Sequence, residues 1–108
     1  MTGDLKETIT SSFDRDVLQS SAPTLVFFWA DWHVRALQTT PTIVELAEQY
    51  AGRVEAFGVD IDQERTLRER YGAREVPTTI LFNRGSEVGR AEGFITLGQL
   101  TDLVQANL

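Results

Sequence analysis

The chain has 108 residues, and its 42% of hydrophobic and 24% of charged residues are typical of one folded domain rather than of a disordered segment. The formal charge of −6, from 16 acidic and 10 basic side chains, argues against nucleic acid and anionic membrane surfaces as partners. Because the chain contains no cysteine, thiol catalysis, disulfides and zinc–thiolate sites are excluded.

Neither a membrane span nor a secretory signal is expected. The sequence has no apolar run of about 18 residues, the length that favours a membrane-spanning helix. The N-terminal stretch "MTGDLKETIT" lacks the basic and apolar regions of a signal peptide. We therefore expect a single cytoplasmic domain over residues 1–108 that needs no cofactor.

The first half of the chain predicts two strands and two helices. Residues 5–10 are a weak strand candidate, and residues 11–20 are typical of a short helix. The run "TLVFFWA" is continuously apolar, which is typical of a strand buried on both faces. From about residue 34 to residue 50 apolar side chains recur with helical spacing, and Gly52 is expected to end that helix.

The second half predicts three further strands and two helices. Residues 53–61 predict a strand, and residues 63–72 predict a charged helix. Residues 78–83 and 87–92 predict a hairpin, because the turn sequence "NRGS" separates them. A capping-box spacing at Thr96 starts the last helix. Strand–helix–strand units followed by a hairpin and a helix predict a mixed sheet with helices on both faces.

Taken in order, these segments resemble the thioredoxin family from about residue 11 to residue 108. "LVFFWADW" resembles the strand that leads into the family's W-C-G-P-C motif, and "TPTIVELAEQYAGRV" resembles the following helix with its internal proline, Pro41. "VDIDQERTLRERYGAREVPTTILFNRG" and "GFITLGQLTDLV" are similar to the rest of the domain. The resemblance implies an α/β thioredoxin fold with a central mixed sheet of four to five strands, about four flanking helices and a cis-proline at Pro77.

The resemblance also locates the family's active-site motif, and its reactive groups are missing. His33 and Ala36 stand where thioredoxins have their two cysteines, with Val34 and Arg35 between them. Disulfide exchange requires attack by one thiolate and release by a second thiol, which imidazole and methyl groups cannot perform. We therefore expect oxidoreductase activity to be lost, and we expect no catalytic residue.

Two positions near the motif depart from the family in a consistent way. Phe27 stands where thioredoxins carry a buried aspartate, and Gly58 stands where they often carry a lysine. A buried carboxylate is unfavourable unless it is paired or useful. An apolar Phe27 removes that cost in a chain where no thiol needs a proton partner, so the departures indicate a protein rebuilt around the loss of redox chemistry.

The surface that thioredoxins use for substrates is expected to survive. In the family, the backbone before the cis-proline pairs with an extended substrate segment, a form of β-strand addition. Cysteine-less relatives are known for non-redox partnerships, which implies a chaperone-like, assembly or scaffold role. We therefore expect another protein or an extended peptide segment to bind at Trp32, His33, Val34, Arg35, Ile61, Val76, Pro77, Gly93 and Phe94.

Other readings stay open. His33 is the single histidine and could act as a general base or a metal ligand, with Asp31 nearby. One histidine falls short of the three or four ligands of a zinc site, and no nucleophile motif accompanies it, so we expect no metal. The chain could also be a scaffold without a partner, or carry the name thioredoxin by similarity while unable to exchange disulfides.

Overall fold

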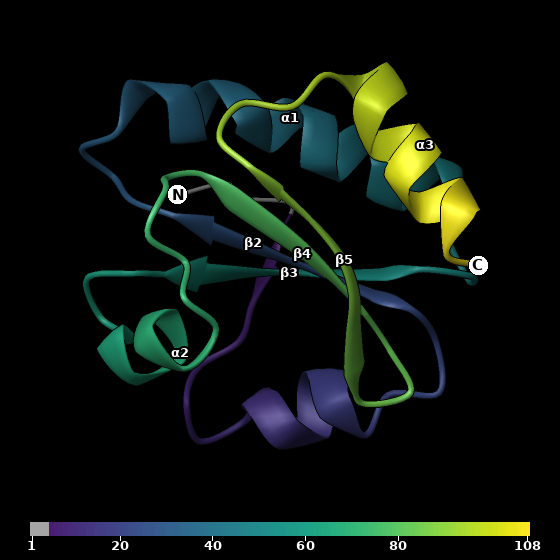
Figure 1. Ribbon diagram of the computed structural model, residues 1–108, viewed down its shortest axis with the longest axis horizontal. Coiled ribbons are helices and arrows are strands. Elements are labelled where there is room, and N and C mark those ends of the chain that lie inside the picture. The colour runs from purple at the N-terminus through teal and green to yellow at the C-terminus, as the bar shows by residue number, and fades with distance from the viewer. Residues whose placement is uncertain (1–4) are drawn as a thin grey trace.

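Five strands form one mixed sheet in the order β1-β3-β2-β4-β5 in the computed structural model, which describes residues 5–108 (Figure 1). β1 and β2 each run parallel to β3, whereas β4 runs antiparallel to both β2 and β5. The predicted mixed sheet is therefore confirmed. The strands are β1 (Lys6–Glu7), β2 (Thr24–Trp29), β3 (Glu55–Asp60), β4 (Thr78–Asn83) and β5 (Ser86–Glu92).

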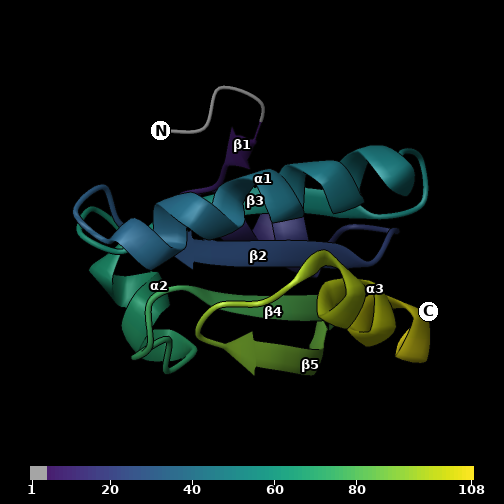
Figure 2. The same ribbon diagram turned by 90° about the horizontal axis from the view of Figure 1, so that it is seen from above.

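Helices cover both faces of this sheet, as predicted (Figures 1 and 2). α1 and α3 pack against each other on one face, where α1 contacts β2 and β3. η1, a short π-helix, contacts β4 on the opposite face, where α2 also lies. Within residues 5–108, no helix has the length and apolar character needed to cross a membrane. The helices are η1 (Asp14–Leu18), α1 (Val34–Gln49), α2 (Arg65–Arg70) and α3 (Leu97–Ala106).

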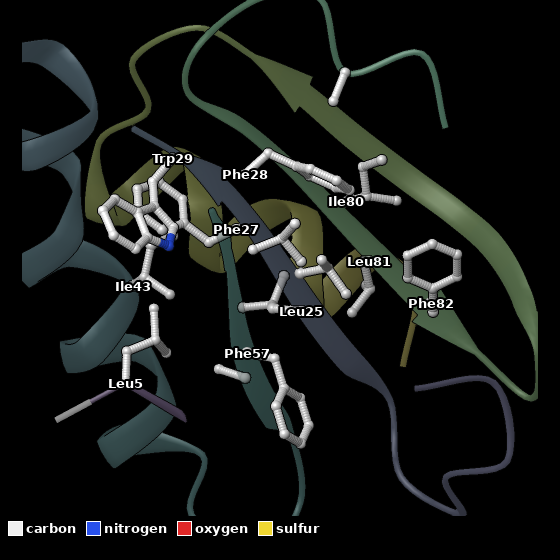
Figure 3. Close-up of a cluster of buried hydrophobic side chains, with 14 of the residues drawn as sticks. Leu5, Leu25, Phe27, Phe28, Trp29, Ile43, Phe57, Ile80, Leu81 and Phe82 are labelled. Carbon is white, nitrogen blue, oxygen red and sulfur yellow. The ribbon is translucent and has the colours of Figure 1, made fainter. Parts of the chain in front are cut away.

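Strand β2 lies in the middle of the sheet, and all its residues are buried. Successive side chains of a strand point to opposite faces. Phe27 and Trp29 accordingly face α1 and lie beside Ile43 (Figure 3), whereas Phe28 faces the other side. The prediction of a strand buried on both faces is confirmed. Its carboxyl end leads directly into the loop that carries Trp32 and His33.

An aromatic cluster fixes the opposite face of the sheet. The ring of Phe13 lies 5.2 Å from that of Tyr71 and 5.7 Å from that of Phe82, measured between centroids. Phe13 is fully buried just before η1, and Phe82 belongs to β4. The Phe13–Phe82 pair packs edge-to-face, with an interplanar angle of 80°, and such packing adds to the stabilisation from burial. The cluster therefore anchors η1 and the end of α2 to the sheet.

The two N-terminal elements are shorter than the sequence predicts. β1 spans two residues rather than residues 5–10, and η1 spans five of the ten residues expected to be helical. After Thr8, whose amide still donates to Gly58 O, the chain leaves the edge of β3. The amide and hydroxyl of Thr10 donate instead to Glu64 Oε1, at 2.8 and 2.9 Å. This side-chain contact replaces the backbone pairing that would have continued the strand.

The β4–β5 turn and the start of α3 form as predicted. Arg84 and Gly85 have φ of 53° and 82°, the left-handed geometry that a tight hairpin turn requires and that glycine adopts readily. At α3, Thr96 Oγ1 accepts from the amide of Gln99, and Gln99 Oε1 accepts from the amide of Thr96. This capping box satisfies backbone donors that the helix itself cannot.

Candidate functional site

The segments that carry the predicted site residues meet at one end of the sheet. The β2–α1, α2–β4 and β5–α3 connections lie together on the left in Figure 1. Thr78 of β4 is in register with both Phe28 and Glu92, so the end of β2, the start of β4 and the end of β5 are adjacent. The amide of Gly93 donates to Pro77 O at 2.7 Å, which joins the last two loops.

His33 is the N-cap of α1. Its Nδ1 accepts a hydrogen bond from the amide of Ala36 at 3.4 Å, and its backbone is extended. Because Nδ1 is the acceptor, the ring must be unprotonated at that atom for the cap to form. Imidazole is not among the usual N-cap groups, so the residue type does not indicate this role.

Trp32 is 62% exposed at the rim of the site. Its Nε1 donates to Asp62 Oδ2 at 2.7 Å, and its ring lies edge-on to that of His33 with 5.5 Å between centroids. These contacts fix an exposed tryptophan in one orientation. Asp62, which lies just after β3, was not among the predicted site residues.

Phe94 lies on the other side of the site, in the β5–α3 loop. It is 47% exposed, and the guanidinium carbon of Arg35 lies 5.9 Å from its ring centroid, within cation–π range. Within residues 5–108, Arg35 forms no ion pair with Asp31 or another carboxylate. Val34, the first residue of α1, is 64% exposed. We call the exposed set of Trp32, Val34 and Phe94 the apolar rim.

The remaining predicted contact residues lie below this surface. Ile61 and Val76 are 1% and 8% exposed, and Pro77 is also buried. The Val76–Pro77 peptide bond is cis. Gly93 is half-buried with φ of 86°, a conformation that favours glycine. The structure therefore brings all the predicted residues to one end of the sheet, but the side chains of Ile61, Val76 and Pro77 support the rim rather than form it.

Comparison with known proteins identifies the family. The thioredoxin family model matches residues 4–106. The chain belongs to the thioredoxin family. Thioredoxin 1 of Nostoc sp. is 32% identical over 98 residues, covering 91% of this chain and 92% of the relative. The thioredoxin of Pseudomonas aeruginosa is 32% identical over 98 residues, with 91% of each chain covered. The thioredoxin of Allochromatium vinosum is 35% identical over 96 residues, with 89% of this chain and 90% of the relative covered.

This thioredoxin-family chain contains no cysteine, so it cannot perform dithiol–disulfide exchange. Among residues 5–108, no group of three or more histidine, aspartate or glutamate side chains is arranged to hold a metal ion. The single histidine is instead engaged at the start of α1. This thioredoxin-family site presents exposed apolar side chains with fixed polar groups beside them.

A carboxyl group lies against this site from the edge of the sheet. Glu7 Oε1 accepts from Trp29 Nε1 at 3.2 Å, and Glu7 is in register with Gly58 of β3. A side chain at position 58 would collide with Glu7 Oε2, so the glycine makes room for the carboxyl group. Burial raises the pKa of Glu7 from 4.5 to about 7; the hydrogen bond from Trp29 opposes this rise, while Asp60 and Asp31 add to it.

We predict that His33→Ala will destabilise the protein by about 1 kcal/mol, because the amide of Ala36 loses its cap. His33→Ser, which keeps an acceptor at the N-cap, is expected to restore most of that stability. Urea unfolding of the three proteins measures both effects. Equal destabilisation by alanine and serine would show that the imidazole has a role other than capping.

We predict that Glu7 makes the protein less stable as pH rises. The folded-state pKa of about 7 lies above the unfolded value of 4.5, so the folded state binds more protons between these values. The stabilisation from Glu7 is therefore complete below about pH 4.5 and is lost as pH rises through about 7. Glu7→Gln, which keeps an acceptor for Trp29, is expected to remove this dependence.

Urea unfolding of the wild type and Glu7→Gln across this range tests the prediction, with the Trp29 indole N–H resonance as a local readout. As pH rises from 4.5 through about 7, the unfolding free energy of the wild type should fall relative to that of Glu7→Gln. A constant difference, together with an indole resonance that does not titrate, would contradict the partial burial of this carboxyl group against Trp29.

Proposed function

We propose that this chain is a redox-inactive protein-binding module of the thioredoxin family that holds another protein, or an extended peptide segment, on its apolar rim. By resemblance, His33 and Ala36 stand at the positions of the two cysteines, and Phe27 stands at that of the buried aspartate. The observation that carries the proposal is the apolar rim itself, retained at the site of a chemistry that the chain cannot perform.

The clustering of exposed apolar side chains supports this proposal. Seven large hydrophobic side chains are exposed within residues 5–108, and three of them form the apolar rim. A fourth, Leu37, lies one helical turn after Val34 in α1. Single exposed apolar residues need no explanation, but several on loops that meet at one end of a sheet are typical of an interaction surface. Trp32 is suited to act as an anchor, because Asp62 already holds its ring in place.

Binding at this surface would be non-covalent throughout. Without a thiol, no mixed disulfide can hold a partner, so affinity depends on burial of the rim and on backbone pairing. By resemblance to the substrate mode of thioredoxins, the backbone beside Pro77 would pair with the extended segment while Trp32 and Phe94 contact its side chains. A chaperone-like, assembly or scaffold role fits reversible holding of this kind.

An enzyme or metal site centred on His33 has less support. Its Nδ1 is occupied as the acceptor of a helix cap, and the described residues supply no set of metal-ligating side chains around it. If the chain were a scaffold without a partner, the exposure of Trp32, Val34 and Phe94 at one site would have no physical explanation. The partner-binding function is therefore the one that we propose.

Affinity capture from a lysate of the native host tests the proposal. We predict that the wild-type chain retains at least one specific protein and that the Trp32→Gln/Phe94→Gln variant loses it. The control is Val88→Gln, because Val88 is also exposed, at 38%, but lies within β5, away from the rim. Thermal unfolding of each variant checks that the fold is kept, which we expect because all three side chains are exposed.

Loss of the captured protein from the rim variant alone would support the proposed surface. Capture that survives in the rim variant and disappears with Val88→Gln would move the interface to β5. The absence of any captured protein for the wild type would contradict a partner-binding function in that host.

A further inference from the structure

Charged side chains are distributed unevenly about the apolar rim. Asp62 lies against Trp32, and Asp60 ends β3 just before it. Asp31 precedes Trp32, and Asp60 is in register with Trp29, whose indole donates to Glu7 of β1, so Asp60 lies toward the β1 edge. The cation Arg35 is directed the other way, over Phe94. The rim therefore has carboxylates on one side and a guanidinium on the other.

The carboxylates on the Trp32 side are held in place, and they form no ion pair with a side chain of residues 5–108. Asp60 Oδ1 accepts from the amides of Asp62 and Gln63 at 2.9 and 3.3 Å, which fixes the start of this loop. Asp62 holds Trp32 through Oδ2 and makes no hydrogen bond through Oδ1 to residues 5–108. Within the same range, Asp31, Asp60 and Asp62 form no ion pair. Their charge therefore remains available to a bound molecule.

We propose that the apolar rim docks an extended segment of a partner protein in which an apolar anchor is flanked by lysine or arginine. The anchor packs on Trp32, Val34 and Phe94, and the flanking cation faces Asp31, Asp60 and Asp62. This inference rests on the proposed function and adds the chemistry of the partner.

Charge complementarity decides this choice of occupant. An acidic segment would meet the three carboxylates beside Trp32, and like charges across an interface are strongly unfavourable. The overall charge of −6 acts in the same direction, since it accelerates the approach of a basic segment. A segment flanked by a cation also has a preferred orientation, with its basic end toward the β1 edge and away from Arg35.

The strongest competing surface is a shallow groove of about 490 Å³ between β5 and α3. It shares Phe94 with the rim and continues over Ile95 and Leu103, with Asp102 at its border. Glu87 and Glu92 already neutralise its cation, Arg90. A peptide seated there would depend on Leu103 rather than on Trp32, which gives the experiment a way to separate the two surfaces.

Selection from a random-peptide display library on the full-length wild-type chain tests the proposal. We expect the enriched peptides to contain an aromatic or aliphatic residue with lysine or arginine beside it. The best peptide is then synthesised with a fluorescent label, and its affinity is measured by polarisation for the wild type and three variants. These variants are Asp31→Asn/Asp62→Asn, Leu103→Gln and, as the rim variant here, Trp32→Gln/Val34→Gln, which leaves Phe94 of the groove in place. Asparagine at position 62 keeps the acceptor for Trp32.

We expect removal of the two carboxylates to weaken binding about ten-fold at low salt, with little difference at high salt where exposed charges are screened. The rim variant should abolish binding, and Leu103→Gln should leave it unchanged. The same peptide with glutamine in place of its basic residue should lose as much affinity as the Asp31→Asn/Asp62→Asn variant loses.

Different failures have different meanings. Enriched peptides that need the rim but carry no basic residue would overturn the partner chemistry and leave the proposed function standing. Peptides that bind through Leu103, with the rim variant unaffected, would place docking in the β5–α3 groove and overturn both proposals. If the wild type selects no peptides beyond those that the rim variant also selects, both the proposed function and the proposed partner chemistry are contradicted.

Discussion

The position of β2 is the constraint on which the rest of the structure depends. This strand lies between β3 and β4 with every side chain buried, so it fixes the register of a parallel neighbour and an antiparallel one. Its carboxyl end delivers Trp32 and His33 to the end of the sheet where Pro77 and Gly93 also lie. The geometry of the site is therefore a consequence of core packing, which explains how the surface can persist in a chain without thiols.

The interior beside the site is apolar at the position where the resemblance implies a buried aspartate. Phe27 is fully buried and in register with Gly58 on one side and Thr79 on the other. The hydroxyl of Thr79 is buried and has no hydrogen-bond partner in the part of the chain that the structure describes. The glycine at position 58 leaves space that Glu7 fills from β1. The carboxyl group of Glu7 thus approaches this interior from the edge of the sheet, where it remains partly exposed, rather than from β2.

Local signals in the sequence predicted most of the fold. β4 has the predicted bounds and α3 has the predicted capping box, because turn residues and capping spacing act over a few neighbouring positions. The resemblance to thioredoxins predicted that the rim residues lie on one surface. It did not indicate that His33 caps α1 or that Trp32 is held by Asp62, which lies 30 residues away in the sequence. Contacts of that kind depend on which loops the fold brings together and on side chains that no local pattern specifies.

The central claim is that the apolar rim contacts a partner protein in the cell. Site-specific photo-crosslinking in the native host tests it most directly, with benzoyl-phenylalanine placed at Val34 and, in a matched strain, at Val88. Both side chains are exposed, but only Val34 lies in the rim. Discrete protein adducts from position 34, with none of the same adducts from position 88, are the predicted result. Adducts from position 88 alone, or identical adducts from both positions, would contradict it.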